Sequence, residues 1–146
     1  MKRLLIVFFV MSVFLGILNA QISAFPWLES FDGEEFPPFG WTVIDADGDG
    51  YNWLRVTSPG YSTNTGEGAV MSESFTVPYI ELMPDNYLIT PQIILPGNVA
   101  TLSWYVRVVS SWFTDEMYSV MVSTTTPTLE AFTSVFTEVL TIEEVS

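Results

Sequence analysis

Alternation between apolar and polar residues is the most regular pattern in the chain, and it is clearest over residues 101–109. One side of this alternation carries Leu102, Trp104, Val106 and Val108, and the other side carries Ser103, Tyr105 and Arg107. A period of two residues matches the pleat of a β-strand, in which successive side chains point to opposite faces. The pattern therefore predicts a strand over residues 101–109 with one buried face.

Further strand-like runs are separated along the chain by proline and glycine. Strands are predicted at residues 41–44, 53–56, 69–75, 87–89 and 118–123. Pro91 and Pro96 bracket residues 92–95, which favours an edge strand or a covered connection there because proline cannot donate to a central ladder. A short helical turn is predicted after Thr126, since threonine can cap a helix and proline is tolerated at its first position.

Many short strands with irregular, glycine-rich connections predict an all-β fold, a jelly-roll β-sandwich of antiparallel strands. The chain has 146 residues, a length that suits one domain. Trp41, Trp53 and Trp104 fall on apolar strand faces and are predicted to be core residues. A last strand-like run, residues 137–142, lies close to Ser146, and a sandwich needs further strands to close its edges. C-terminal strands are therefore expected to be missing from a truncated chain.

The first twenty residues have a different character from the rest. They read MKRLLIVFFVMSVFLGILNA, with a basic start, an apolar run over residues 4–18 and a small residue at Ala20. This is the order of a secretory signal peptide. A membrane anchor is the alternative, but an apolar run of about 15 residues is shorter than the roughly 20 that span a bilayer. We therefore expect a signal peptide at residues 1–20 and a secreted or cell-surface domain at residues 21–146, with no membrane insertion once the signal is removed.

The charge of the chain restricts its partners. Its net charge is −13, and removal of Lys2 and Arg3 with the signal peptide makes it more negative by two. Nucleic acid and anionic membranes would repel such a protein. Because the chain contains no cysteine and no histidine, disulfides, Ser-His or Cys-His catalytic pairs and imidazole zinc sites are excluded. Surplus carboxylates instead suit a divalent cation, and calcium is the natural one outside a cell.

The stretch DADGDGYNW, residues 45–53, places an aspartate at every second position. Asp45, Asp47 and Asp49 supply three short carboxylates for calcium, which prefers six to eight oxygen ligands. Gly50 lets the backbone turn, and Tyr51 holds the position that offers a backbone carbonyl.

An EF-hand and a solvated turn are the two other interpretations of this loop. An EF-hand is excluded because Val56 stands where that motif requires a bidentate glutamate, and strands rather than helices flank the loop. A solvated turn is the remaining alternative, since Asp and Gly are common turn residues. Three like charges so close together repel one another unless a cation neutralises them, which favours a metal site.

Several motifs occur in an order that resembles a known family. They are LESFDG (28–33), PFGWTVIDADGDGYNW (38–53), AVMSESF (69–75), MPDNYLITPQIILPG (83–97) and TLSWYVR (101–107). Together they resemble the cleaved-adhesin domain, also known as the choice-of-anchor J family, which is the repeated module of gingipain and haemagglutinin adhesin regions. The resemblance covers nearly all of the chain after the signal peptide.

The resemblance implies a jelly roll that binds structural calcium, has no catalytic centre and serves adhesion to glycans or to host or matrix proteins. It implies one calcium on Asp45, Asp47, Asp49 and the Tyr51 carbonyl. A second would lie near the first strand, with Glu29 as its ligand and help from residues 62–68. It also implies that the domain is part of a larger multidomain surface protein, with haemagglutinin-like activity.

Other functions remain open on the sequence. Trp112 and Phe113 lie in a predicted loop and are candidate ligand-binding residues, although burial under that loop is equally compatible with the pattern. A glycosidase on a jelly-roll scaffold needs two carboxylates at a defined separation in a cleft, and no pair stands out. A spacer or accessory role within a secreted protease is the third possibility, because fold alone does not define function.

Overall fold

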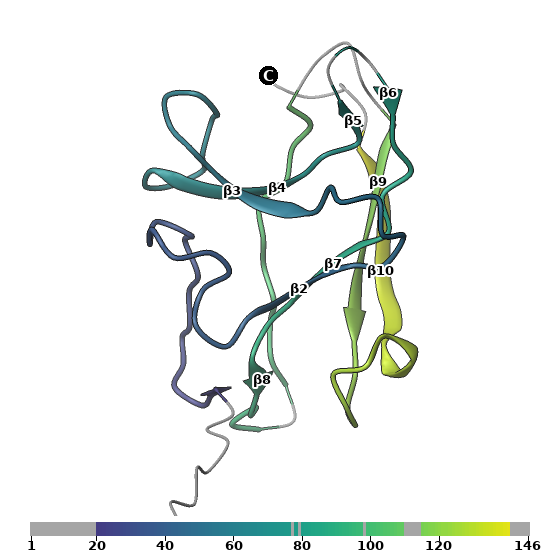
Figure 1. Ribbon diagram of the computed structural model, residues 1–146. Helices are drawn as coiled ribbons and strands as arrows, with labels where there is room; N and C mark the ends of the chain where they lie inside the picture. The colour runs from purple at the N-terminus through teal and green to yellow at the C-terminus, as the bar shows by residue number, and fades with distance from the viewer. Residues whose placement is uncertain (1–19, 77, 79, 98, 110–114, 141–146) are drawn as a thin grey trace, which may run out of the picture.

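The computed structural model describes residues 20–76, 78, 80–97, 99–109 and 115–140, and it consists of short strands (Figure 1). In chain order the elements are β1 (Gln21–Ile22), β2 (Thr42–Asp45), β3 (Trp53–Thr57), β4 (Gly68–Ser72), β5 (Phe75–Thr76), β6 (Ile80–Glu81), β7 (Asn86–Ile89), β8 (Gln92–Ile93), β9 (Glu116–Val122), the 3-10 turn η1 (Leu129–Ala131) and β10 (Thr133–Leu140). These described ranges contain no α-helix. They therefore contain no helix that is long and apolar enough to span a membrane. The all-β prediction is confirmed.

The strands combine into five two-stranded sheets within the part of the chain that is described. β2 pairs antiparallel with β7, β3 with β4, β5 with β6 and β9 with β10, while β1 lies parallel to β8. The β9–β10 hairpin is the longest pair and stands on one side of the molecule, opposite the loops around β3 and β4 (Figure 1). Antiparallel pairing agrees with the jelly-roll prediction, whose strand order stays a prediction.

Most predicted strands are found close to their predicted positions. β2, β3, β7 and β9 overlap the predicted segments, and the segment at residues 69–75 divides into β4 and the start of β5. The predicted helical turn corresponds to η1. β8 is a two-residue strand whose partner is β1, as expected for an edge.

The strand predicted at residues 101–109 is wrong in this structure. This segment has no strand assignment, and nearly all of its side chains are exposed. A strand requires a neighbour for its backbone N–H and C=O groups, and no backbone hydrogen bond joins residues 101–108 to another residue of the described ranges.

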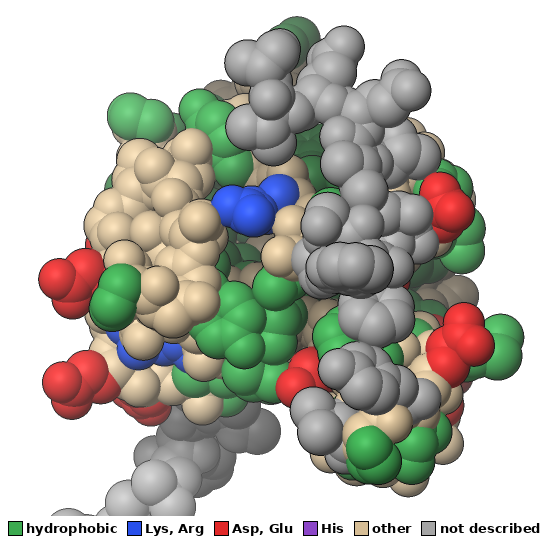
Figure 2. All heavy atoms as spheres, turned by 90° about the horizontal axis from the view of Figure 1, so that it is seen from above, with side chains coloured by type: hydrophobic (Ala, Val, Ile, Leu, Met, Phe, Trp, Pro, Cys, Tyr) green, Lys and Arg blue, Asp and Glu red, His purple; other side chains and the backbone are tan. Residues whose placement is uncertain are grey.

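The predicted core is only partly formed. Trp41 and Trp53 are half-buried, whereas Trp104 is 40% exposed, so its assignment to the core is not supported. Among the described hydrophobic residues only Val56, in β3, is buried, with 7% of its surface exposed. Figure 2 shows hydrophobic side chains gathered in a hollow on one face of the molecule.

Candidate metal centre

The aspartate loop connects two paired strands. Asp45 is the last residue of β2 and lies opposite Asn86 of β7, and β3 starts at Trp53. The N–H of Ala46 donates to the Asp85 carbonyl at 2.9 Å, which ties the start of the loop to the segment before β7. The loop is therefore fixed at both ends by backbone pairing.

Asp45 organises the interior of the loop. Its Oδ1 accepts a hydrogen bond from the Gly48 N–H at 2.7 Å, and its Oδ2 accepts one from the Gly50 N–H at 2.9 Å. Gly48 and Gly50 have φ values of +73° and +87°, a region that side-chain-bearing residues rarely adopt. The Gly50 N–H holds the pKa of the Asp45 carboxyl below its ordinary value, against the raising effect of desolvation. Asp45 therefore carries its negative charge inside the turn.

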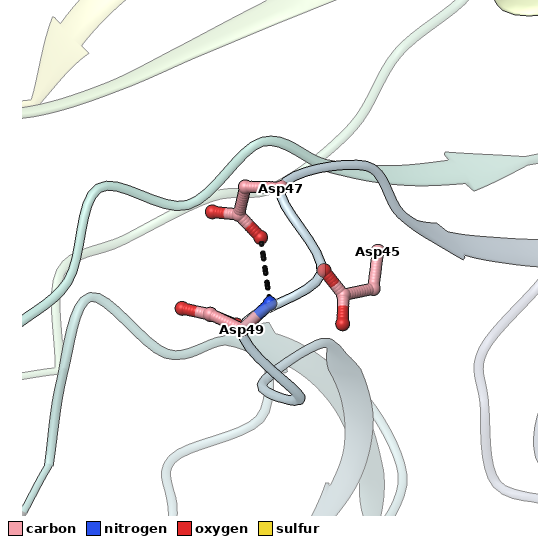
Figure 3. A group of neighbouring side chains, drawn as sticks. All are labelled: Asp45, Asp47 and Asp49. Carbon is pink, nitrogen blue, oxygen red and sulfur yellow. Dashed lines mark hydrogen bonds between the residues drawn. The ribbon is translucent and has the colours of Figure 1, made fainter.

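The other two aspartates are exposed, and the Asp47 carboxylate points toward the backbone nitrogen of Asp49 (Figure 3). Asp47 Oδ1 accepts from the Asp49 N–H at 3.4 Å, and Asp49 Oδ1 accepts from the Tyr51 N–H at 2.8 Å. One carboxylate oxygen from each of Asp45, Asp47 and Asp49 lies within 4.8 Å of the others. Two oxygens on opposite sides of calcium, each at about 2.4 Å, are separated by about 4.8 Å, so the three oxygens are close enough to share one ion.

The residue paired with Asp45 across the sheet carries a further oxygen. Side chains opposite each other in an antiparallel pair have Cβ atoms about 5 Å apart, and Asn86 is opposite Asp45. Asn86 Nδ2 donates to Ser72 Oγ at 3.0 Å, whereas Asn86 Oδ1 is buried and is the side-chain atom of the described residues left without a hydrogen-bond partner. An amide oxygen without a partner, on the residue paired with Asp45, is of the ligand type that calcium prefers.

The remaining predicted site residues have different surroundings. Tyr51 is in the loop and its N–H bonds Asp49, while the role of its carbonyl stays a prediction. Glu29 is distant in sequence from the loop and accepts from the Phe31 N–H at 2.9 Å. The described ranges contain no second group of three acidic residues as close as the aspartate cluster, so a second site at Glu29 also stays a prediction. Trp112 and Phe113 lie outside the described residues.

The sequence interpretation missed Asp32, which contacts the 62–68 segment through backbone hydrogen bonds. Asp32 Oδ1 accepts from the N–H groups of Glu67 and Gly68 at 2.7 and 2.8 Å and so joins the first loop to the 62–68 segment. The Gly68 N–H is the main cause that lowers the pKa of the Asp32 carboxyl. In the sequence, the only sign of this contact is the aspartate within LESFDG. The residues that Asp32 bonds lie 35 and 36 positions further along the chain, so no local pattern identifies them.

A shallow pocket beside this junction is lined by Glu29, Phe31, Glu35 and Arg55, among others. Its volume of about 190 Å³ is below the roughly 300–1,000 Å³ of small-molecule sites. This pocket therefore offers no cleft in which a sugar could be held between two carboxylates.

The fold and the loop together define the class of the protein. It is an all-β domain with a candidate cation-binding turn between paired strands. Within that class the match is specific: a family model described as Cleaved Adhesin Domain matches residues 24–145. The chain belongs to the cleaved-adhesin family, which confirms the resemblance found in its sequence motifs.

The chain is similar to proteins of Porphyromonas gingivalis. Hemagglutinin A is 48% identical over 101 residues, which are 66% of this chain and 4% of that protein. Gingipain R1 from strain ATCC 33277 is 40% identical over 111 residues, which are 75% of this chain and 6% of that protein. The chain thus spans a small part of the length of these relatives, in which the matching domain belongs to a much larger protein.

Two solved structures share the fold. The K1 cleaved adhesin domain of Lys-gingipain from Porphyromonas gingivalis W83 superimposes with a TM-score of 0.63 and 34% identity, covering 77% of this chain and 66% of that domain chain. The K2 cleaved adhesin domain of Lys-gingipain gives a TM-score of 0.59 and 31% identity, covering 77% and 65%. Roughly a third of each solved chain therefore has no counterpart here.

Proposed function

We propose that this chain is an exported, non-catalytic adhesion domain that binds calcium in its aspartate loop and recognises glycans or host or matrix proteins as part of a larger secreted or cell-surface protein. The observation that carries the adhesion proposal is the family match over residues 24–145. The name Hemagglutinin A of a relative that is 48% identical supports the same interpretation.

Calcium binding is supported by the chemistry of the loop. Asp45, Asp47 and Asp49 each bring one carboxylate oxygen within 4.8 Å of the others. Among the described residues, the hydrogen bonds to these carboxylates come from N–H groups of the same turn and of Asp85, which partly compensate their charge. The Asn86 side chain adds a buried oxygen opposite Asp45. Bound calcium would supply the missing positive charge and hold the loop in one conformation. The loop would then lose less conformational entropy when a glycan or protein binds beside it.

The non-catalytic proposal follows from the positions of the acids. The three clustered carboxylates sit on an exposed turn, and the pocket beside Glu29 and Glu35 is too small to enclose a sugar. A glycosidase needs its two carboxylates on opposite sides of a bound sugar ring. A spacer role remains the second candidate, favoured by the small share of each relative that the domain occupies.

A glycan and matrix-protein array, probed with the purified chain in calcium and in chelator, tests the proposal. We expect calcium-dependent binding to at least one glycan or protein, and loss of that binding in Asp47→Asn, whose side chain lies at the exposed edge of the loop. Glu130→Gln, an exposed acid in η1, is the matched control. Absence of binding at every calcium concentration would favour the spacer role, and hydrolysis of an arrayed glycan would contradict the non-catalytic proposal.

The array also tests the two predicted ligand residues. Joint replacement of Trp112 and Phe113 by alanine should weaken binding if their rings contact the ligand. Alanine has no ring on which the ligand could pack. Unchanged binding with an unchanged unfolding midpoint would remove them from the site.

A further inference from the structure

A second pocket lies beside the start of β2 and shares Glu29 and Phe39 with the pocket already described. Its volume is about 210 Å³, below the roughly 300–1,000 Å³ of sites for drug-sized molecules. Three aromatic rings, of Trp27, Phe39 and Trp41, belong to its wall, and its charged lining residue is Glu29. This pocket therefore has room for one long side chain of a partner.

The aromatic rings around this pocket are held in place by the fold. Trp27 and Trp41 lie with their ring centroids 6.0 Å apart, and Phe31 packs edge-on against Trp41 at 5.3 Å. The Trp41 N–H donates to the Pro38 carbonyl at 2.9 Å and closes the turn that carries Phe39. Phe39 is 77% exposed, so this turn presents its ring to a partner instead of burying it.

Glu29 supplies a negative charge beside these rings. Its Oε1 accepts a hydrogen bond from the Phe31 N–H at 2.9 Å, which is the one hydrogen bond to this carboxylate within the described part of the chain. Arg55 lines the neighbouring pocket, but its Nε and Nη2 donate to the main-chain carbonyls of Phe31 and Asp32. Among the described residues, Glu29 Oε2 is therefore left available to an incoming donor.

Aromatic walls beside a carboxylate suit an organic cation. A cation over the face of an aromatic ring is attracted by the ring quadrupole, and arginine makes this contact more often than lysine. A guanidinium can also stack on a ring while it donates to a carboxylate. Calcium prefers six to eight oxygen ligands, which a wall of rings does not supply. The net charge of −13 adds long-range attraction for a basic partner and repels an anionic one.

The pocket is separate from the aspartate loop. Trp41 directly precedes β2 and Asp45 ends it, so the two are about 13 Å apart at roughly 3.3 Å per residue. In Figure 1 the segment over residues 20–41, coloured purple to blue, lies on the opposite side of the molecule from the β9–β10 hairpin. A partner could therefore occupy this pocket whether or not the aspartate loop holds an ion.

We propose that the pocket formed by Trp27, Glu29, Phe39 and Trp41 binds the side chain of an exposed arginine on a partner protein. The guanidinium lies against the aromatic rings and donates to the Glu29 carboxylate. This inference rests on the proposed adhesion function and specifies its partner as a protein with a basic surface.

Peptide titration of the purified chain tests the inference, followed by the NMR chemical shifts of the indole N–H groups of Trp27 and Trp41. The probe is the acetylated and amidated peptide Gly-Gly-Arg-Gly-Gly. The reference is the same peptide with citrulline, which keeps the shape of arginine without its charge. We expect the arginine peptide to bind about tenfold more tightly than the citrulline peptide, with a lysine peptide between them. All titrations are made in millimolar calcium and repeated in chelator, and the affinities should agree.

Three variants test the residues. Glu29→Gln should weaken binding of the arginine peptide about tenfold, because it removes the charge and keeps the shape. Glu34→Gln is the matched control, since Glu34 is an exposed acid of the same loop that lines neither pocket, and it should change the affinity less than about twofold. Phe39→Ala should weaken binding about threefold. Because the Phe39 ring is largely exposed, this variant keeps the test informative if Glu29→Gln does not fold.

Several outcomes would overturn the inference. Equal affinities for the arginine and citrulline peptides would contradict recognition of a cation. Equal weakening by Glu29→Gln and Glu34→Gln would show attraction to the overall charge only. Binding in chelator that calcium abolishes would assign Glu29 to the predicted second calcium site. Protection of the Gln21 α-amino group from acetylation in the chain without its leader, lost in Glu29→Gln, would assign the pocket to the chain's own N-terminus.

The peptide titration and the array fail independently. Adhesion on the array without binding of the arginine peptide would contradict the arginine pocket and leave the proposed function in place. Binding of the arginine peptide without adhesion to any arrayed glycan or protein would support the pocket and contradict the adhesion proposal.

Discussion

Arg55 Nε donates a hydrogen bond of 2.7 Å to the main-chain carbonyl of Phe31, across 24 residues of sequence. Arg55 Nη2 donates to the next carbonyl, that of Asp32, at 2.9 Å. Phe31 has a φ of +59°, which is unusual for a residue with a side chain. One guanidinium in β3 thus holds two successive carbonyls of the first loop and stabilises a backbone conformation that is unfavourable by itself.

Replacement of Arg55 by lysine should destabilise the protein. A lysine ammonium cannot reproduce the planar pair of donors, so at least one carbonyl contact is lost. We expect the free energy of unfolding to fall by about 1–3 kcal/mol, the range for a hydrogen bond to a charged group, as measured by urea denaturation. Arg107→Lys is the control, because Arg107 is exposed and bonds only the carbonyl of its neighbour Val108 among the described residues. Equal stability of the two variants would show that the Arg55 contacts contribute nothing.

Gly68, the first residue of β4, should not tolerate alanine. An added Cβ would lie 1.9 Å from the Phe31 carbonyl oxygen, and Arg55 restrains that carbonyl. Overpacking against a fixed backbone costs about 1–3 kcal/mol, so Gly68→Ala should lower the thermal unfolding midpoint clearly. Gly97→Ala, where nothing lies within 4 Å of the added atom, should leave it nearly unchanged. An unaffected Gly68→Ala variant would contradict the close approach of the two loops.

Calcium should raise the unfolding temperature through the aspartate loop. A ligand that binds only the folded state stabilises it in proportion to the logarithm of its concentration. We expect differential scanning calorimetry to show a higher midpoint in calcium than in chelator, and no such difference for Asp49→Asn. Asparagine can still accept the Tyr51 N–H, so this change removes charge while keeping the turn. Glu130→Gln should respond to calcium like the unmodified chain, and identical midpoints in calcium and chelator for the unmodified chain would rule out the site.

Tyr118 should ionise only at unusually high pH. Partial burial raises its pKa above the ordinary value, and the hydrogen bond to Glu138 adds to this effect. Because the folded-state pKa is the higher one, this contribution to stability is complete below the unfolded pKa of about 10 and is lost as pH rises through the folded-state pKa. Ultraviolet titration, with Tyr118→Phe to identify the signal, should show a lower pKa in Glu138→Gln. An unchanged pKa in that variant would contradict the Tyr118–Glu138 contact.

Local features of the candidate site could be predicted from the sequence because they depend on neighbours along the chain. The carboxylate of Asp45 bonds N–H groups three and five residues away, and the two glycines allow the required turn. Alternating aspartates with glycines therefore specify the convergence of the three side chains almost by themselves. The ion remains a proposal, because oxygen atoms at a suitable spacing also occur in solvated turns.

Contacts between distant segments could not be predicted in the same way. Asp32 and Gly68 meet because two loops approach each other, and neither residue has a local pattern that identifies its partner. The alternation over residues 101–109 correctly indicates a segment with two different sides, but it does not identify the neighbouring strand. Strand pairing depends on partners far away in the sequence or on another polypeptide, so the prediction of a buried face is wrong for the chain taken by itself.

The position of β1 bears on the predicted signal peptide. β1 starts at Gln21, and its backbone is already engaged with β8 through the pairs Gln21–Gln92 and Ile22–Ile93. If the predicted signal peptide is removed after Ala20, the first two residues of the new N-terminus are the ones that pair with β8 in the folded chain. We then expect removal to precede the pairing of β1 with β8, because the formed sheet lies directly beside the predicted cleavage point.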